Sequence, residues 1–140
     1  MLLAEGAEGA PRLRLLVVDE YRLLAWMVEQ LSPPGTQIRG TASFEEARRI
    51  VLENPPDAAV VSLTPARLPW REFQQLCASR ERPVPVLYQS CVFPSGEEAG
   101  LGMAGGVALF LRKPATRAEL EAALLCLLEA AEKAGTPAAL

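Results

Sequence analysis

The sequence contains no histidine. Histidine is the usual general base near neutral pH, so its absence excludes Ser/His and Cys/His catalytic pairs, histidine zinc ligands and phosphohistidine relays. Any catalysis would have to use carboxylates, lysine or serine. Cysteine is also scarce: Cys77, Cys91 and Cys126 are odd in number and widely separated, which fits neither a disulfide framework nor a CxxC metal site. We interpret these cysteines as reduced, buried thiols of a cytoplasmic protein.

Long apolar runs and an excess of positive charge are missing as well. No segment approaches the roughly 18 to 20 apolar residues that a membrane span requires, and the first residues do not form an export signal. The net charge of -3 gives no general attraction for phosphate backbones. These absences predict a cytoplasmic protein that binds neither membranes nor nucleic acid. The 140 residues have room for one domain.

What the sequence does contain is an alternation of buried strands and helices. Short apolar runs are typical of strands buried on both faces of a parallel sheet, and they occur at 13–18, 57–63, 83–90 and 106–111, with a more polar extended stretch at 36–40. Apolar residues recur at helical spacing in 23–31, 44–54, 67–80 and 115–135.

Two of these helices have start signals, whereas one further helix is weakly specified. Ser43 with Glu46, and Thr116 with Glu119, form capping-box patterns at the beginning of their helices. Residues 95–106 contain five glycines, so a helix in this segment is expected to be short or mobile.

The alternation of strand and helix predicts an α/β fold. We expect a doubly wound, five-stranded parallel sheet with helices on both faces, in a single three-layer domain. This domain is placed at residues 12–133. The Gly-, Ala- and Glu-rich residues 1–11 are expected to form a flexible N-terminal tail, and residues 134–140 a C-terminal tail.

Polar residues follow the predicted strands. Ligands of open α/β sheets bind at the carboxyl ends of the strands, and all parallel strands end at the same edge. The residues at these ends are Asp19 and Glu20, Ser62, Gln89 and Ser90, and Lys113 followed by Pro114. Two acids, several hydroxyl or amide groups and one lysine are therefore expected to converge.

The motifs VVDE, PDAAVVSL, PVLYQS and FLRKP carry a family resemblance. In this order and spacing they resemble the receiver domain of two-component response regulators, the CheY-like superfamily. The resemblance spans about residues 12–133 and implies the flavodoxin-like strand order 2-1-3-4-5. It also implies a cis peptide bond before Pro114.

The resemblance further assigns roles at the strand ends. It implies that Asp19 and Glu20 hold Mg²⁺. Ser90 would sense a phosphoryl group, and Lys113 would pair with that group. Phe110 would be the switch aromatic of the family.

The position of the phospho-acceptor, an Asp in the family, falls on Ser62. An aspartate is ionised at pH 7 and serves as nucleophile and Mg²⁺ ligand, whereas a hydroxyl needs an activating base and binds hard cations poorly. We therefore expect an atypical pseudo-receiver without phosphotransfer to this position. The following loop also departs from the family at Pro65, Ala66 and Trp70, and Trp70 would either cover the pocket or join the core.

Two interpretations stay open for the charged residues. Asp19 and Glu20 form either a weak Mg²⁺ site or a solvated pair, because no third carboxylate accompanies them. Lys113 would pair with these acids in place of a phosphoryl group. No other cofactor and no catalytic residue is predicted, so the chain is not expected to be an enzyme.

The last helix is apolar on more than one side. The residues that can face the sheet are Leu120, Ala123, Leu124, Leu127 and Leu128. The predicted interaction face consists of Ala118, Ala122, Leu125 and Cys126. A helix that is apolar all round is buried or meets a partner, and in receivers this region is the usual dimer and partner face. We expect a homodimer or docking through this face.

The sequence thus predicts a stand-alone receiver-like module of a bacterial two-component-type pathway, acting by protein contact without Asp phosphorylation. Its partners would be other signalling proteins, such as a sensor kinase or an output protein. Two alternatives stay open. In the first, the chain would be a receiver that is phosphorylated at Asp57 or Asp19. In the second, it would be a flavodoxin-like module that binds a small molecule. The segment DEYRLL after the first strand has no phosphate-binding glycine, which argues against the second alternative.

Overall fold

The computed structural model describes residues 13–20, 22–63, 70–90 and 107–135, and the statements below concern these residues. The elements in chain order are β1 (Arg14–Val18), α2 (Leu23–Leu31), β2 (Gln37–Thr41), α3 (Phe44–Glu53), β3 (Ala58–Ser62), α4 (Trp70–Ala78), β4 (Val86–Ser90), β5 (Ala108–Arg112) and α6 (Arg117–Gly135). The predicted tail 1–11, the glycine-rich segment 95–106 and the loop residues Pro65 and Ala66 lie outside the described residues.

The strands form one parallel sheet in the order β2-β1-β3-β4-β5. β1 lies between β2 and β3, so Val17 is paired with Gly40 on one side and with Val60 on the other. β4 continues the sheet next to β3, and β5 follows at the edge. The predicted strand order is therefore confirmed.

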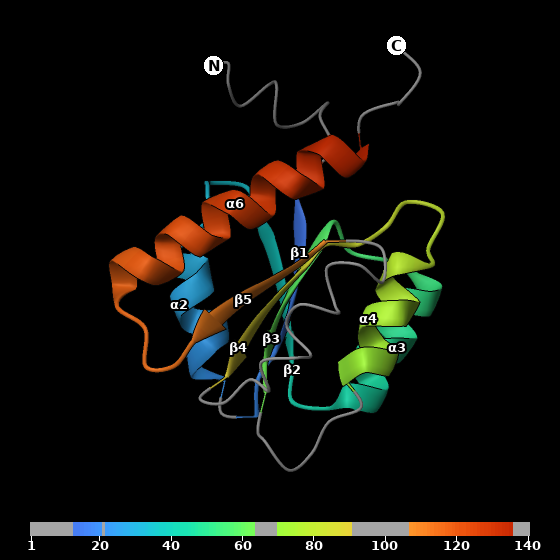
Figure 1. The fold of residues 1–140 in the computed structure, drawn as a ribbon, viewed down its shortest axis with the longest axis horizontal. Helices are drawn as coiled ribbons and strands as arrows, with labels where there is room; N and C mark the ends of the chain where they lie inside the picture. Colours follow the sequence, from blue (N-terminus) through green and yellow to red (C-terminus); the bar gives the residue numbers. More distant parts are fainter. Residues whose placement is uncertain (1–12, 21, 64–69, 91–106, 136–140) are drawn as a thin grey trace.

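Helices cover both faces of the sheet, as Figure 1 shows with α2 and α6 on one side and α3 and α4 on the other. Successive side chains of a strand point to opposite faces. In β1, Leu15 and Val17 join the core under α2 and α6, whereas Leu16 and Val18 join the core under α3 and α4. This double burial explains the continuous apolar runs and confirms the three-layer α/β class.

The two predicted capping boxes form differently. In α6, the Thr116 hydroxyl accepts from the Glu119 N–H at 3.0 Å and the Glu119 carboxylate accepts from the Thr116 N–H at 2.8 Å, so the box is complete. At α3, the Ser43 hydroxyl accepts from the Glu46 N–H at 3.1 Å, but the Ser43 N–H donates to the Thr41 hydroxyl. Glu46 accepts from Thr41 instead of closing the box.

α6 ends at Gly135, where the helical pattern of residues 115–135 also ends. The peptide bond between Lys113 and Pro114 is cis, as the resemblance implied. Within the described ranges, no helix combines the length and the apolar character needed to cross a bilayer.

A polar cluster around Asp57 connects several segments at the amino ends of the strands. The Asp57 carboxylate accepts from the Arg14 backbone N–H at 2.7 Å and lies 3.2 Å from the Arg82 guanidinium. The Arg14 guanidinium donates to Asn54 at 2.9 Å and to the Pro55 carbonyl. Asp57 thus joins the start of β1 to the segment before β4.

We expect Asp57→Ala to lower the free energy of unfolding by about 1–3 kcal/mol, because it leaves the part-buried Arg14 N–H without its acceptor and removes the ion pair with Arg82. Urea denaturation measures this change. The matched control is Glu53→Ala on the exposed end of α3, for which a change within about 0.5 kcal/mol is expected. Equal stabilities of the two variants would show that the Asp57 cluster contributes nothing.

Candidate functional site

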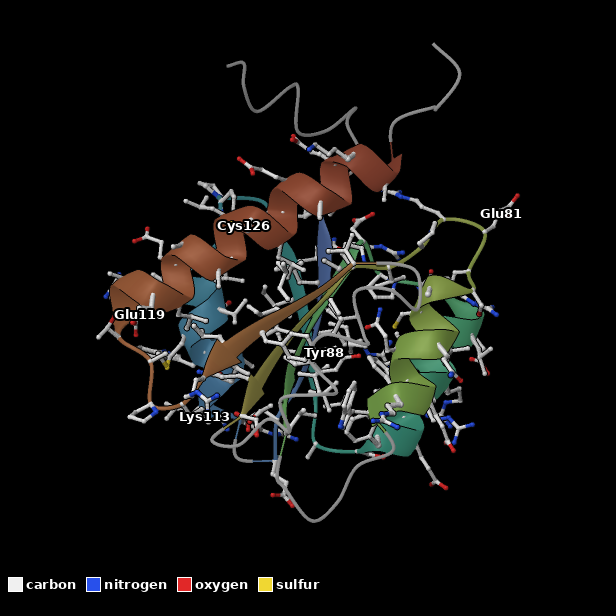
Figure 2. The ribbon with its side chains drawn as sticks, in the orientation of Figure 1. Glu81, Tyr88, Lys113, Glu119 and Cys126 are labelled. Carbon is white, nitrogen blue, oxygen red and sulfur yellow. The ribbon has the colours of Figure 1, made fainter. Side chains whose placement is uncertain are left out.

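The predicted strand-end residues lie at the carboxyl edge of the sheet. Asp19 follows β1, Ser62 ends β3 and Ser90 ends β4. Lys113 follows β5, and its backbone N–H donates to the Ser90 carbonyl at 2.8 Å, which extends the β4–β5 pairing by one residue. Figure 2 shows Lys113 at this edge. The parallel sheet therefore brings together residues that are far apart in sequence.

The Lys113 ammonium group donates to the hydroxyl of Ser62 across a distance of 2.5 Å. Both side chains are half-buried, and 51 residues separate them in the chain. The sequence suggested instead that Lys113 would pair with Asp19 and Glu20. The contact that the structure gives for its ammonium group is with Ser62, at the position that the resemblance assigned to the acceptor.

Asp19 and Glu20 have different surroundings. Asp19 is buried, and its carboxylate accepts from the Leu24 N–H at 2.8 Å, in the first turn of α2. A carboxylate is stabilised at this place because the N–H groups of a first helical turn have no partner within the helix. Glu20 is exposed. Asp19 therefore anchors the start of α2, whereas Glu20 lies at the surface.

The donor set does not fit a Mg²⁺ ion. This ion requires hard oxygen ligands in nearly octahedral geometry, most of them carboxylates or waters. The third strand end offers only the neutral Ser62 hydroxyl, which already accepts from the Lys113 ammonium group. Among the described residues, no group of three His, Cys, Asp or Glu side chains could hold a metal ion.

Three aromatic rings lie on the α3/α4 side of β4 and β5. Phe110 stacks on Tyr88, with ring centroids 5.6 Å apart. The ring centroid of Trp70 lies 5.7 Å from that of Tyr88 and 6.4 Å from that of Phe110. Trp70 is partly buried against the core. Of the two interpretations of Trp70, the structure thus favours the core residue. The proposed switch aromatic Phe110 is held between two rings.

The sequence analysis missed a buried polar pair behind these rings. The Tyr88 hydroxyl donates to the Gln74 amide oxygen at 2.8 Å, and both side chains are almost fully buried. Burial raises the pKa of Tyr88, so the phenol stays neutral and remains a donor. Among the residues that the structure describes, none is a hydrogen-bond partner of the Gln74 amide nitrogen. A glutamine between Trp70 and Cys77 on the apolar face of α4 was the available signal.

The predicted interaction face of α6 is exposed. Leu125 is 57% exposed, and Ala118, Ala122 and Cys126 are also exposed, whereas Leu120, Leu124 and Leu127 are buried. The exposure of Cys126 corrects the expectation that the cysteines are buried thiols. Cys77 is buried, which raises the pKa of its thiol to about 12, and Cys91 lies outside the described residues.

A second exposed apolar pair lies on α2. Leu23 and Trp26 are 61% and 59% exposed, respectively. Leu23 belongs to the apolar pattern from which this helix was predicted, but only Leu24 and Val28 of α2 are fully buried. A periodic pattern therefore located the helix without defining its buried face.

No family model and no curated protein matches the chain. Solved structures do match. They include an orphan response regulator of H. pylori, with a TM-score of 0.68, 22% identity, and 84% of this chain and 99% of that chain covered. A chemotaxis response regulator of Vibrio cholerae has a TM-score of 0.67 and 17% identity, with 84% and 99% covered.

A third match is the receiver domain of a sensor histidine kinase from Pseudomonas aeruginosa, described with a magnesium ion in its active-site cleft. Its TM-score is 0.64 at 22% identity, with 85% of this chain and 99% of that chain covered. Together with the strand order, these likenesses show the class of the molecule: the chain has the CheY-like receiver fold of response regulators.

We expect Tyr88→Phe to destabilise the fold by about 1–3 kcal/mol. The buried Gln74 side chain would then have no hydrogen-bond donor for its amide oxygen, in addition to its unpaired amide nitrogen. The double variant Tyr88→Phe with Gln74→Leu should recover most of this loss, since it removes the buried amide as well. Chemical denaturation of both variants and of Gln74→Leu alone completes the cycle. A double variant that loses as much as the sum of the single variants would contradict the proposed pairing.

Proposed function

We propose that the chain is a non-enzymatic, receiver-fold signalling module of two-component type that acts by binding other proteins, without phosphorylation at the acceptor position. The observation that carries this proposal is the 2.5 Å contact between Lys113 and Ser62. In a phosphorylated receiver this lysine would bind the phosphoryl group. Here a neutral side chain of the protein itself accepts one of the three N–H bonds of this lysine.

The chemistry of Ser62 supports this proposal. A serine hydroxyl becomes a nucleophile only when a base removes its proton. The chain has no histidine, and the neighbouring Lys113 donates to the hydroxyl oxygen. The poor fit to Mg²⁺ removes the ion that would neutralise an incoming phosphoryl group. Both requirements of phosphotransfer are therefore weakened at the same place.

The surroundings of the two other candidate acceptors argue against the alternative of phosphorylation elsewhere. Asp57 lies before β3, at the amino edge of the sheet, where it binds the Arg14 N–H and Arg82. Asp19 is buried and accepts from the Leu24 N–H. Phosphorylation of either carboxylate would cost a structural hydrogen bond.

Exposed apolar side chains support an action through protein contact. Leu125 on α6, and Leu23 and Trp26 on α2, are each more than half exposed. Large apolar side chains gathered at the surface commonly mark binding sites. We propose that α6 supplies the main docking surface, that the partners are a sensor kinase or an output protein, and that the protein acts in the cytoplasm.

The test is incubation with Mg²⁺ and acetyl phosphate, followed by intact-mass measurement. We expect no phosphoryl adduct on the wild-type chain, whereas Ser62→Asp should gain one. The Asp variant supplies the missing carboxylate next to Lys113, and it thereby restores a nucleophile that is ionised at pH 7.

Ser62→Ala is the matched control, because it removes the hydroxyl without adding a charge, and it should gain no adduct. An adduct on the wild-type chain would overturn the proposed function. If the Ser62→Ala variant also carried this adduct, the phosphorylated residue would be one other than Ser62.

A further inference from the structure

A pocket of about 460 Å³ lies at the amino ends of the outer strands β1 and β2. It is lined by residues of these two strands, of α3 and of the segment that follows α3. β2 forms one edge of the sheet, next to β1 (Figure 1). Pockets of this size commonly hold small organic molecules. We call this cavity the amino-edge pocket, because Ser62 and Lys113 lie at the opposite ends of the strands.

Two arginines line the amino-edge pocket, one from each strand: Arg14 from β1 and Arg39 from β2. The register pairs Arg39 with Leu16, which lies two residues after Arg14 on the same face of β1. Leu16 joins the core on the α3 side, so both arginines belong to that face. The strand spacing and the rise per residue place their Cα atoms roughly 8 Å apart. Side chains as long as arginine can therefore reach one common ligand group.

The positive charge of Arg14 is held in place by neutral groups. Its guanidinium donates to the Asn54 amide oxygen at 2.9 Å and to the Pro55 carbonyl. Both acceptors are uncharged, so these hydrogen bonds fix the guanidinium without cancelling its charge. They use two of its five N–H donors. Arg14 thus offers an oriented positive charge with further donors to a ligand in the pocket.

The charge of Arg39 is only partly compensated. Its guanidinium lies 3.7 Å from the Glu46 carboxylate, and the guanidinium of Arg49 lies 3.8 Å from the same carboxylate. Glu46 also accepts from the Thr41 hydroxyl. One negative charge is therefore shared by two arginines, and an exposed ion pair at such a distance contributes little free energy. Arg39 can turn to an anion in the pocket at a small cost.

The remaining lining combines an apolar wall with polar amides. Leu16, Ile50 and Pro56 line the pocket and are buried. Gln37 and Asn54 line it as well and are exposed, so their amide groups lie at its rim. An apolar wall, a few polar groups and a fixed charge are the usual composition of a small-molecule site.

We propose that the amino-edge pocket reversibly binds a small organic phosphate. The phosphate group lies between Arg14 and Arg39, and the apolar body of the ligand lies against Leu16 and Ile50. Guanidinium groups bind phosphate oxygens through paired N–H donors, and two of them match the double negative charge of a phosphate monoester better than the single charge of a carboxylate. The site is remote from Ser62, so this inference goes beyond the proposed function and does not rest on it.

Titration of the ¹⁵N-labelled full chain with phenyl phosphate, followed by NMR, tests the site. We expect saturable shifts of the backbone amide signals of Gln37, Arg39 and Asn54. Inorganic phosphate lacks the apolar body, and benzoate carries one charge instead of two, so each should bind roughly tenfold more weakly. Benzyl alcohol, which has the apolar body without a charge, should cause no saturable shift.

Arg39→Gln should raise the dissociation constant of phenyl phosphate roughly tenfold, because it removes one of the two guanidinium groups. Arg49→Gln is the matched control. It removes an equally exposed arginine that pairs with the same Glu46 carboxylate but does not line the pocket, so it should leave the affinity nearly unchanged. Arg14 is left in place because its hydrogen bonds also support the fold.

Three results would overturn the site: phenyl phosphate that shifts no amide signal of the pocket, phenyl phosphate that binds no more tightly than inorganic phosphate, and an equal loss of affinity in Arg39→Gln and Arg49→Gln. The last result would mean that the ligand responds to the general positive charge of this surface. Benzoate that binds as tightly as phenyl phosphate would overturn the assignment to a phosphate.

Discussion

Burial of the parallel sheet on both faces is the constraint on which the rest of the structure depends. The inner strands β1, β3 and β4 are mostly apolar and buried, and water must be kept from both sides of them. This requirement places α2 and α6 on one face and α3 and α4 on the other (Figure 1). Because all strands run in one direction, it also gathers their carboxyl ends at a single edge, where the candidate site lies.

At that edge, a hydrogen bond within the protein stands where receivers make a covalent phosphoryl adduct. The hydrogen bond from the Lys113 N–H to the Ser90 carbonyl extends the pairing of β5 with β4 by one residue. From this position, the Lys113 side chain contacts Ser62 at the end of β3. The hydroxyl accepts one of the three N–H bonds of the ammonium group, which keeps its positive charge. This contact joins the carboxyl ends of β3 and β5.

Much of the fold could be predicted from the sequence, because strands buried on two faces and helices with caps leave local patterns. The motif order also located the strand-end residues, including Ser62 and the cis bond before Pro114. The analysis failed where the surroundings of a residue decide its role. Leu23 shares the apolar pattern of α2 but is exposed, and Gln74 is polar but buried. Hydropathy describes a residue type, whereas burial depends on which neighbours reach it.

The sequence by itself determined the fold class, the strand order through its family resemblance, and the presence of a serine, not an aspartate, at position 62. These properties follow from local periodicity and from the chemistry of single side chains. Only the tertiary structure decided that Lys113 binds Ser62 and that Asp19 binds the start of α2. It also decided that Cys126 is exposed. These are contacts or exposures set by packing between distant segments, and the 51 residues between Ser62 and Lys113 carry no local pattern that specifies their contact.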